Sequence, residues 1–327
     1  MHVLVIGAAG MIGRKLVARL LSERALAGRA IERLTLHDVV RPEPPADAPF
    51  AVESRASDLS APGEAERLVA ERPAVIFHLA AIVSGEAEAD FDKGYRINLD
   101  GTRLLFEAVR GVGDGYKPRL VFTSSIAVFG APFPDAIPDD FHLTPLTSYG
   151  AQKAMGELLL ADYTRRRFFD GVGIRLPTIC VRPGKPNKAA SGFFSGIIRE
   201  PLSGEEAILP VEDDVRHWHA SPRSAVGFLL HAAGLAGERV GPRRNLTMPG
   251  LSVTVAEQIE ALRRVAGEGP VRRIRREPDE TIRAIVAGWP RRFDARRATE
   301  LGFVADPSFD EIIRIHIEDE RAGAFVP

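Results

Sequence analysis

Short apolar runs alternate with helical patterns through the first half of the chain. The runs have the length of strands and lie at residues 2–7, 33–39, 50–58, 74–81, 119–125 and 171–182. Between them, helices are expected at residues 8–23, 62–71, 98–110 and 149–167. Strands that read as continuous apolar runs and are separated by helices are typical of a parallel sheet covered on both faces. The pattern therefore predicts an α/β fold with a Rossmann-type doubly wound parallel sheet.

The second half is less regular, because proline and glycine interrupt it often. Helices are predicted at residues 254–267, with Thr254 as the N-cap, and at residues 309–320. We expect an NAD-binding domain over residues 1–175, which also takes in part of 215–250. Residues 176–327 are expected to form mainly a smaller, discontinuous substrate-binding lobe.

Composition narrows the possible partners. The chain has 43 basic and 44 acidic residues, and nucleic-acid binders usually carry a clear basic excess. No apolar run reaches the roughly 18 residues that a membrane span needs. The one cysteine, Cys180, cannot form an internal disulfide, which favours a reducing compartment. We therefore expect a cytoplasmic enzyme that binds neither nucleic acid nor a membrane.

Three glycines lie between the first predicted strand and the first predicted helix. The stretch "GAAGMIG" places Gly7, Gly10 and Gly13 at this junction. A turn without side chains lets backbone N–H groups approach a pyrophosphate, and the helix N-terminus adds a favourable partial charge. In this context the glycines predict a dinucleotide-binding turn, although a plain glycine-rich turn is the alternative.

Acidic residues follow the second and third predicted strands. A carboxylate at Asp38 can accept both ribose hydroxyls of the adenosine and would repel a 2′-phosphate, which favours NAD over NADP. Arg41 lies nearby and could serve a 2′-phosphate, so NADP stays open. Asp58 is placed to contact adenine or, equally, to cap the next helix.

Tyr149 and Lys153 lie four residues apart, on one face of the predicted helix 149–167. A tyrosine ordinarily has a pKa of about 10, and a neighbouring ammonium and a nicotinamide cation would lower it. The phenolate could then take a hydroxyl proton while hydride leaves the same carbon. Ser125 ends the preceding strand, where it could align the reacting oxygen.

The motifs "GAAGMIG", "HLAA", "TSSIAVFG" and "YGAQK", in this order, resemble those of the extended short-chain dehydrogenase/reductases. This family includes nucleotide-sugar epimerases and dehydratases. The resemblance extends over nearly the whole chain and implies that Ser125, Tyr149 and Lys153 are catalytic. It implies NAD as the cofactor and a possible homodimer. The expected cofactor-binding residues are Gly7, Gly10, Met11, Ile12, Gly13, Asp38, Asp58, Leu59, Leu79, Ala80, Asn98, Tyr149, Lys153 and Thr178.

Departures from the family pattern fall where substrates are recognised. The chain has Phe129 where the family often has tyrosine, and "RLPTICVRPG" lacks the asparagine usual in nucleotide-sugar enzymes. These differences imply that a UDP-sugar site has been lost. The segment "RLPTICVRPGKPNKAASGFFSGIIREPL" instead resembles the D-erythronate dehydrogenases within this family, which oxidise the C2 hydroxyl of a four-carbon sugar acid with NAD.

A small hydroxy acid offers a carboxylate, which favours cations and clustered N–H donors as partners. The candidate substrate contacts are Ser84, Ser125, Tyr149, Thr178, Asn187, Lys188 and Arg216. His217 and His219 would share one face of a strand, but no third ligand is evident and we expect no metal site. Two other functions remain open: a nucleotide-sugar epimerase or dehydratase with tightly bound NAD, and a non-catalytic NAD-sensing protein.

Overall fold

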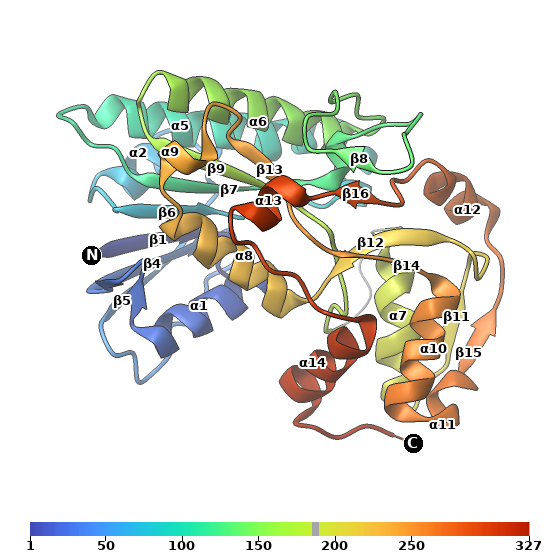
Figure 1. Ribbon diagram of the computed structural model, residues 1–327. Coiled ribbons are helices and arrows are strands. Elements are labelled where there is room, and N and C mark those ends of the chain that lie inside the picture. Colours follow the sequence, from blue (N-terminus) through green and yellow to red (C-terminus); the bar gives the residue numbers. More distant parts are fainter. Residues whose placement is uncertain (185–189, 327) are drawn as a thin grey trace.

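The computed structural model describes residues 1–184 and 190–326, and a seven-stranded parallel sheet lies at its centre (Figure 1). The strand order is β13-β9-β7-β6-β1-β4-β5. The strands are β1 (His2–Ile6), β4 (Arg33–Asp38), β5 (Ala51–Ala56), β6 (Val75–His78), β7 (Arg119–Ser125), β9 (Asp170–Leu176) and β13 (Asn245–Thr247). All neighbouring strands pair in parallel, which confirms the predicted doubly wound sheet. The direction of strand addition reverses between β1 and β6, where such sheets bind ligands.

Helices cover both faces of this sheet (Figure 1). One face carries α2 (Glu64–Val69), α5 (Gly101–Val112) and α6 (Ser148–Arg165), and the other carries α1 (Met11–Glu23) and α8 (Pro222–Gly234). Both faces of the central strands β1, β6 and β7 are therefore buried, which explains why their sequences are largely apolar rather than alternating, whereas the edge strand β5 has no buried residue.

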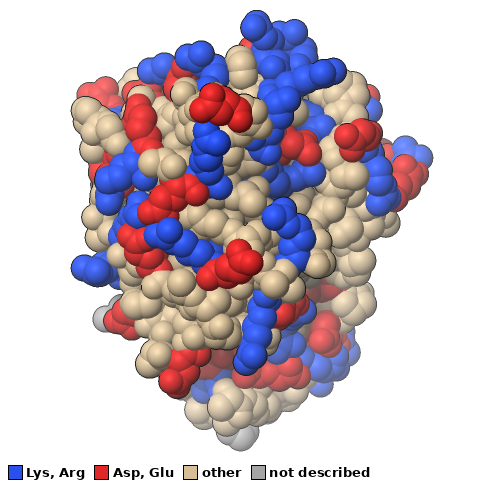
Figure 2. All heavy atoms as spheres, turned by 90° about the vertical axis from the view of Figure 1, so that its left-hand side faces the viewer, with Lys and Arg blue, Asp and Glu red and all other residues tan. Residues whose placement is uncertain are grey.

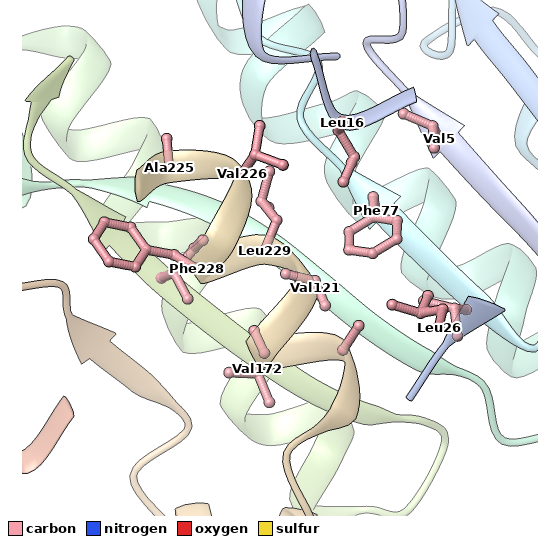
Figure 3. Packing of buried hydrophobic residues seen from close by; sticks show 14 of the residues in the cluster. Val5, Leu16, Leu26, Phe77, Val121, Val172, Ala225, Val226, Phe228 and Leu229 are labelled. Carbon is pink, nitrogen blue, oxygen red and sulfur yellow. The ribbon is translucent and has the colours of Figure 1, made fainter. Parts of the chain in front are cut away.

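The core beneath α1 and α8 joins segments that are far apart in the sequence. Figure 3 shows Val226 and Leu229 of α8 lying over the sheet, in one buried cluster with Val121 of β7 and Val172 of β9. Leu16 of α1 belongs to the same cluster and is fully buried. The chain therefore returns to the sheet after residue 220. There α8 joins α1 on one face of the sheet, and β13 extends the sheet beside β9.

The predicted strand over residues 171–182 is divided in two. It breaks at Pro177, because proline has no N–H for a strand ladder. Beyond the break, β10 (Thr178–Ile179) pairs with β12 (Arg216–Ala220), and β12 pairs in turn with β14 (Leu251–Thr254). The run 171–182 is the last strand that the sequence predicts for the sheet, but β9 is not the edge strand, because β13 pairs beside it as a seventh strand.

A second core lies in the smaller lobe, at the right of Figure 1. It lies among α7 (Gly192–Leu202), α10 (Val255–Ala266) and α14 (Phe309–Arg321). Thr254 caps α10 as predicted: its hydroxyl accepts a hydrogen bond from the Glu257 N–H (3.1 Å), and the Glu257 carboxylate accepts one from the Thr254 N–H (2.6 Å).

The other elements are short. They are β2 (Ala25–Leu26), β3 (Arg29–Ala30), α3 (Ser84–Ala89), α4 (Phe91–Gly94), the π-helical turn η1 (Tyr95–Asp100), the 3₁₀ turn η2 (Ile126–Val128), β8 (Ile137–Pro138), β11 (Ala207–Leu209), α9 (Gly237–Val240), α11 (Glu268–Val271), β15 (Ile274–Arg276), α12 (Glu280–Ala287), β16 (Phe293–Asp294) and α13 (Arg296–Glu300). Figure 2 shows acidic and basic side chains interspersed on one face of the molecule, in line with the balanced composition. Among the described residues, no helix has the length and apolar character needed to cross a membrane.

Candidate active site

The glycine turn lies at the switch point, between β1 and α1. A side chain at Gly13 would place its Cβ 2.1 Å from the Gly7 carbonyl oxygen, so glycine is required for the helix to pack on the turn. No side chain caps α1, and its first turn has no acidic residue. The first N–H groups of α1, at Met11 and Ile12, have no acceptor within the helix and are suited to bind a pyrophosphate. These residues fit an NAD molecule.

Asp38 ends β4 beside this turn. One of its carboxylate oxygens accepts a hydrogen bond from the Ala9 N–H (2.9 Å), and the other accepts one from the Val39 N–H (2.7 Å). The carboxylate is thereby fixed next to the phosphate turn, and its remaining lone pairs are available to ribose hydroxyls. Arg41, the residue that left NADP open, is exposed.

Asp58 does not cap α2, which begins at Glu64 with Gly63 as its N-cap. Its carboxylate accepts hydrogen bonds from Ser60 Oγ (2.6 Å) and Arg96 Nη1 (2.5 Å) instead. Burial opposes ionisation, but these hydrogen bonds keep the pKa of Asp58 below its usual value. Leu59, the next residue, is buried. The capping alternative is therefore wrong, and the adenine contact stays a prediction.

The end of β6 passes directly over the glycine turn. The N–H groups of Leu79 and Ala80 both donate to the Ile6 carbonyl, at 2.8 and 3.1 Å. Asn98 is buried and bonds the backbone of Ile82 in both directions (2.9 and 3.2 Å), which fixes the segment that follows. Ser84, at the start of α3, is partly buried on that segment. Asn98 thus shapes the strip of chain that is predicted to run along the cofactor.

Tyr149 lies beside Ser125 because two chain segments approach unusually closely. A Cβ on Gly150 would lie 2.3 Å from the Ala127 carbonyl oxygen, so only glycine lets the first turn of α6 rest on the turn after β7. Thr147 caps this helix by accepting a hydrogen bond from the Gly150 N–H (3.1 Å). The contact places the Tyr149 hydroxyl within hydrogen-bonding reach of Ser125, at the C-terminal end of β7.

Lys153 lies one turn further along α6, with only 2% of its surface exposed. Its ammonium donates to the Thr123 carbonyl (2.8 Å) and lies 4.9 Å from the centre of the Phe122 ring. Burial lowers the pKa of Lys153 to about 8, and the negative charge of Glu157 opposes the change.

Glu157 is itself buried and accepts several hydrogen bonds on the far side of Lys153 from Tyr149. Its carboxylate accepts hydrogen bonds from Ser124 Oγ (2.5 Å) and from Arg175 Nε and Nη2 (2.9 and 2.8 Å). Arg175 also bonds the Asp139 carbonyl (2.8 Å). The negative charge of Glu157 partly compensates the positive charge of Lys153.

The pKa of Tyr149 differs from the sequence expectation. Burial raises it above the usual value, while the hydrogen bond from Ser125 and the positive charge of Arg182 act in the opposite direction. From the sequence, Lys153 is expected to lower this pKa, but its ammonium lies 5.8 Å from the centre of the tyrosine ring and donates to the Thr123 carbonyl. In the polypeptide alone, the tyrosine is therefore a protonated group at neutral pH.

Thr178 belongs to β10 and makes a defined hydrogen bond to His217. Burial lowers the pKa of His217 to about 4, so the ring is neutral. Its Nδ1 lies 3.0 Å from the Pro290 carbonyl and must donate to it, which leaves Nε2 to accept from the Thr178 hydroxyl at 2.7 Å. The Thr178 oxygen is thus restricted to accepting hydrogen bonds from a ligand.

Other candidate substrate contacts lie elsewhere. Arg216 donates to the Ser252 carbonyl (2.7 Å) and pairs with Glu257 (3.3 Å), at the end of β12 away from Thr178. Asn187 and Lys188 lie outside the described residues. Arg182, which the sequence argument passed over, is the charged residue that acts on Tyr149.

His217 and His219 do share one face of β12, as their spacing predicts. Phe194 lies against both rings, stacked on His217 with centroids 5.3 Å apart. In residues 1–184 and 190–326, no group of three or more histidine, cysteine, aspartate or glutamate side chains could hold a metal ion.

Comparisons with known proteins agree with these features. Residues 3–220 match the model of the NAD dependent epimerase/dehydratase family. The chain is 52% identical to a D-erythronate dehydrogenase of Cupriavidus necator over 324 residues, which is 98% of both proteins. It is 43% identical to a D-erythronate dehydrogenase of Haemophilus influenzae, over 97% of this chain and 99% of the relative.

A solved structure described as a nucleoside-diphosphate-sugar epimerase from Agrobacterium tumefaciens is 69% identical. It superimposes with a TM-score of 0.97, over 99% of this chain and 95% of that one. The glycine turn, the tyrosine helix and these full-length similarities lead to one conclusion: the chain belongs to the NAD dependent epimerase/dehydratase family, as its motifs predicted.

Proposed function

We propose that this protein oxidises the C2 hydroxyl of D-erythronate with NAD and releases 2-dehydro-D-erythronate. Full-length similarity to two proteins named D-erythronate dehydrogenase supports this substrate. The structural observation that carries the proposal is the Ser125–Tyr149 pair, held at the carboxyl edge of the sheet by the contact between Gly150 and Ala127.

Each residue of the site has a distinct part in the proposed reaction. Ser125 hydrogen-bonds the reacting oxygen and orients it, and Tyr149 takes the proton from that oxygen. Bound NAD supplies the hydride acceptor and a cationic ring that favours the phenolate. Lys153 adds a positive charge behind the tyrosine, and Thr178 accepts a hydrogen bond from another substrate hydroxyl.

The same geometry serves a sugar epimerase or dehydratase, which returns the hydride to its substrate. The name of the relative from Agrobacterium tumefaciens favours this second candidate. The two differ in one measurable way, because only the dehydrogenase converts added NAD to NADH in net amounts.

The test is NADH formation by the purified protein in the presence of D-erythronate and NAD. We expect NADH to accumulate with wild type, to be lost in Tyr149→Phe, and to persist in Tyr163→Phe. Tyr163 is the matched control, since it lies on the same helix and bonds Glu107 away from the site. If no four- to six-carbon sugar acid yields NADH, the dehydrogenase proposal fails.

The proposal extends to the organisation of the protein. Residues 1–175 with part of 215–250 are assigned to NAD, and mainly residues 176–327 to the substrate. We also propose that the protein forms a homodimer and is located in the cytoplasm. Gel filtration with light scattering tests the dimer, and limited proteolysis with and without NAD tests the division.

A further inference from the structure

Arg182 lies just beyond β10, and hydrogen bonds fix both its backbone and its side chain. Its Nε donates to the Ile179 carbonyl (3.1 Å), and its Nη2 donates to Ser191 Oγ (2.6 Å). Its backbone N–H donates to Ser195 Oγ (3.0 Å), and its carbonyl accepts from Arg199 Nη1 (2.7 Å). The start of α7 therefore fixes both the backbone and the guanidinium group of this arginine.

No carboxylate of the described residues compensates the charge of Arg182. Burial lowers its pKa, the Cys180 thiol and the Tyr149 hydroxyl raise it, and the positive charge of Arg199 lowers it further. The arginines at comparable depth differ in this respect. Arg119 and Arg244 pair with Asp170, Arg175 with Glu157, and Arg199 with Glu200. A guanidinium removed from water without a counter-ion favours an anion from outside the chain.

The position of this charge matches the chemistry of a 2-hydroxy acid. The positive charge of Arg182 acts on the Tyr149 hydroxyl and opposes the rise of its pKa, so the guanidinium lies near the proposed base. In a 2-hydroxy acid the carboxylate is bonded directly to the carbon that loses hydride. An anchor for that carboxylate must therefore lie close to the base that takes the proton.

We propose that Arg182 binds the carboxylate of the substrate and selects sugar acids over neutral sugars. The inference rests on the proposed function and adds a residue that the sequence argument did not include. Ser191 and Ile179 hold the guanidinium in place, and its remaining N–H groups would bind the carboxylate. Arg216 is the rival, because it was the described cation that the sequence favoured.

The experiment measures binding and turnover separately in Arg182→Gln, Arg216→Gln and the surface control Arg276→Gln, which loses only a pair with Asp213. D-erythronate is titrated into the protein–NADH complex, and KM and kcat are determined for D-erythronate with NAD. The neutral amide of D-erythronate is titrated in parallel. Thermal unfolding and the NADH dissociation constant report on folding and on the cofactor site.

We expect Arg182→Gln to weaken D-erythronate binding about 10- to 100-fold, the loss of one charge-assisted contact. Amide binding should change less than about threefold, NADH binding should be unaffected, and wild type should prefer the acid. Equal weakening of acid and amide would show a structural role and overturn the proposal. So would a loss of acid binding in Arg216→Gln with none in Arg182→Gln. If wild type binds the acid but forms no NADH, the proposed reaction fails while the anion site stands.

Discussion

Replacing Lys153 with methionine should make the protein more stable while abolishing catalysis. Lys153 is 2% exposed, and burial lowers its pKa from 10.5 to about 8. Each tenfold change in proton affinity corresponds to about 1.4 kcal/mol, so keeping the ammonium in this environment costs about 3 kcal/mol near neutral pH. Methionine has a similar shape and removes that cost.

Part of the gain is offset by lost contacts. The hydrogen bond from Lys153 to the Thr123 carbonyl (2.8 Å) is worth about 1 kcal/mol. We therefore expect Lys153→Met to raise the free energy of unfolding by about 2 kcal/mol near neutral pH. Tyr149 loses the positive charge behind it, and NADH formation should fall below detection.

The pH dependence identifies the cause. Below pH about 8 the lysine is charged in both the folded and the unfolded protein, so the full cost is present. Between about 8 and 10.5 the folded protein releases its proton first, and the stability of wild type rises with pH. Above this window the lysine is neutral in both states, and the advantage of methionine disappears.

The assay is guanidinium unfolding of both proteins without cofactor, across this pH window. Only the difference between the two proteins is interpreted, because other groups titrate equally in both. Lys93→Met is the control, since the Lys93 side chain is 40% exposed and its ion pair with Glu86 contributes little. If Lys153→Met is less stable than wild type near pH 7, or if the difference does not vary with pH, the reasoning is refuted.

Three further substitutions test other parts of the structure. Glu157→Gln removes the counter-charge of Lys153 and leaves Arg175 only its longer pair with Asp139 (3.9 Å), so it should lower the free energy of unfolding by about 3 kcal/mol, whereas the exposed Glu260→Gln should change it little. Asp38→Asn should raise the KM for NAD about tenfold and reduce discrimination against NADP; unchanged kinetics with both cofactors would contradict its role. Thr254→Ala removes the N-cap of α10 and should cost about 1 kcal/mol in denaturant unfolding with kcat unchanged.

The sequence predicts the central sheet well because its signals are local. Six of the seven strands are strand-length runs, mostly apolar except in β5, and glycines mark the turn after β1. The seventh, Asn245–Thr247, has only three residues and no period to detect, so the prediction misses it. Pro177 is visible in the sequence, yet the new pairing of β10 with β12 depends on residues about 40 positions away.

The site is predicted less completely, for a related reason. Residue type and spacing identify Tyr149 and Lys153, but they do not reveal burial, which determines the pKa of each. Arg182 and Arg216 look alike in sequence, as single arginines beside short apolar runs. They differ in their partners. Arg216 forms an ion pair with Glu257, whereas no carboxylate of the described residues pairs with Arg182.

The environment of Lys153 depends on much of the chain. Glu157 opposes the loss of its proton, and Arg175 holds that carboxylate in place. Arg175 in turn bonds the Asp139 carbonyl, and the Asp139 carboxylate pairs with Arg297 at 2.6 Å. Arg297 lies in α13, near the end of the chain, so the segment after residue 290 contributes to the environment of a residue in α6. The Tyr-Lys spacing is therefore a necessary part of the site, but the charge on Lys153 is set by contacts that only the folded chain creates.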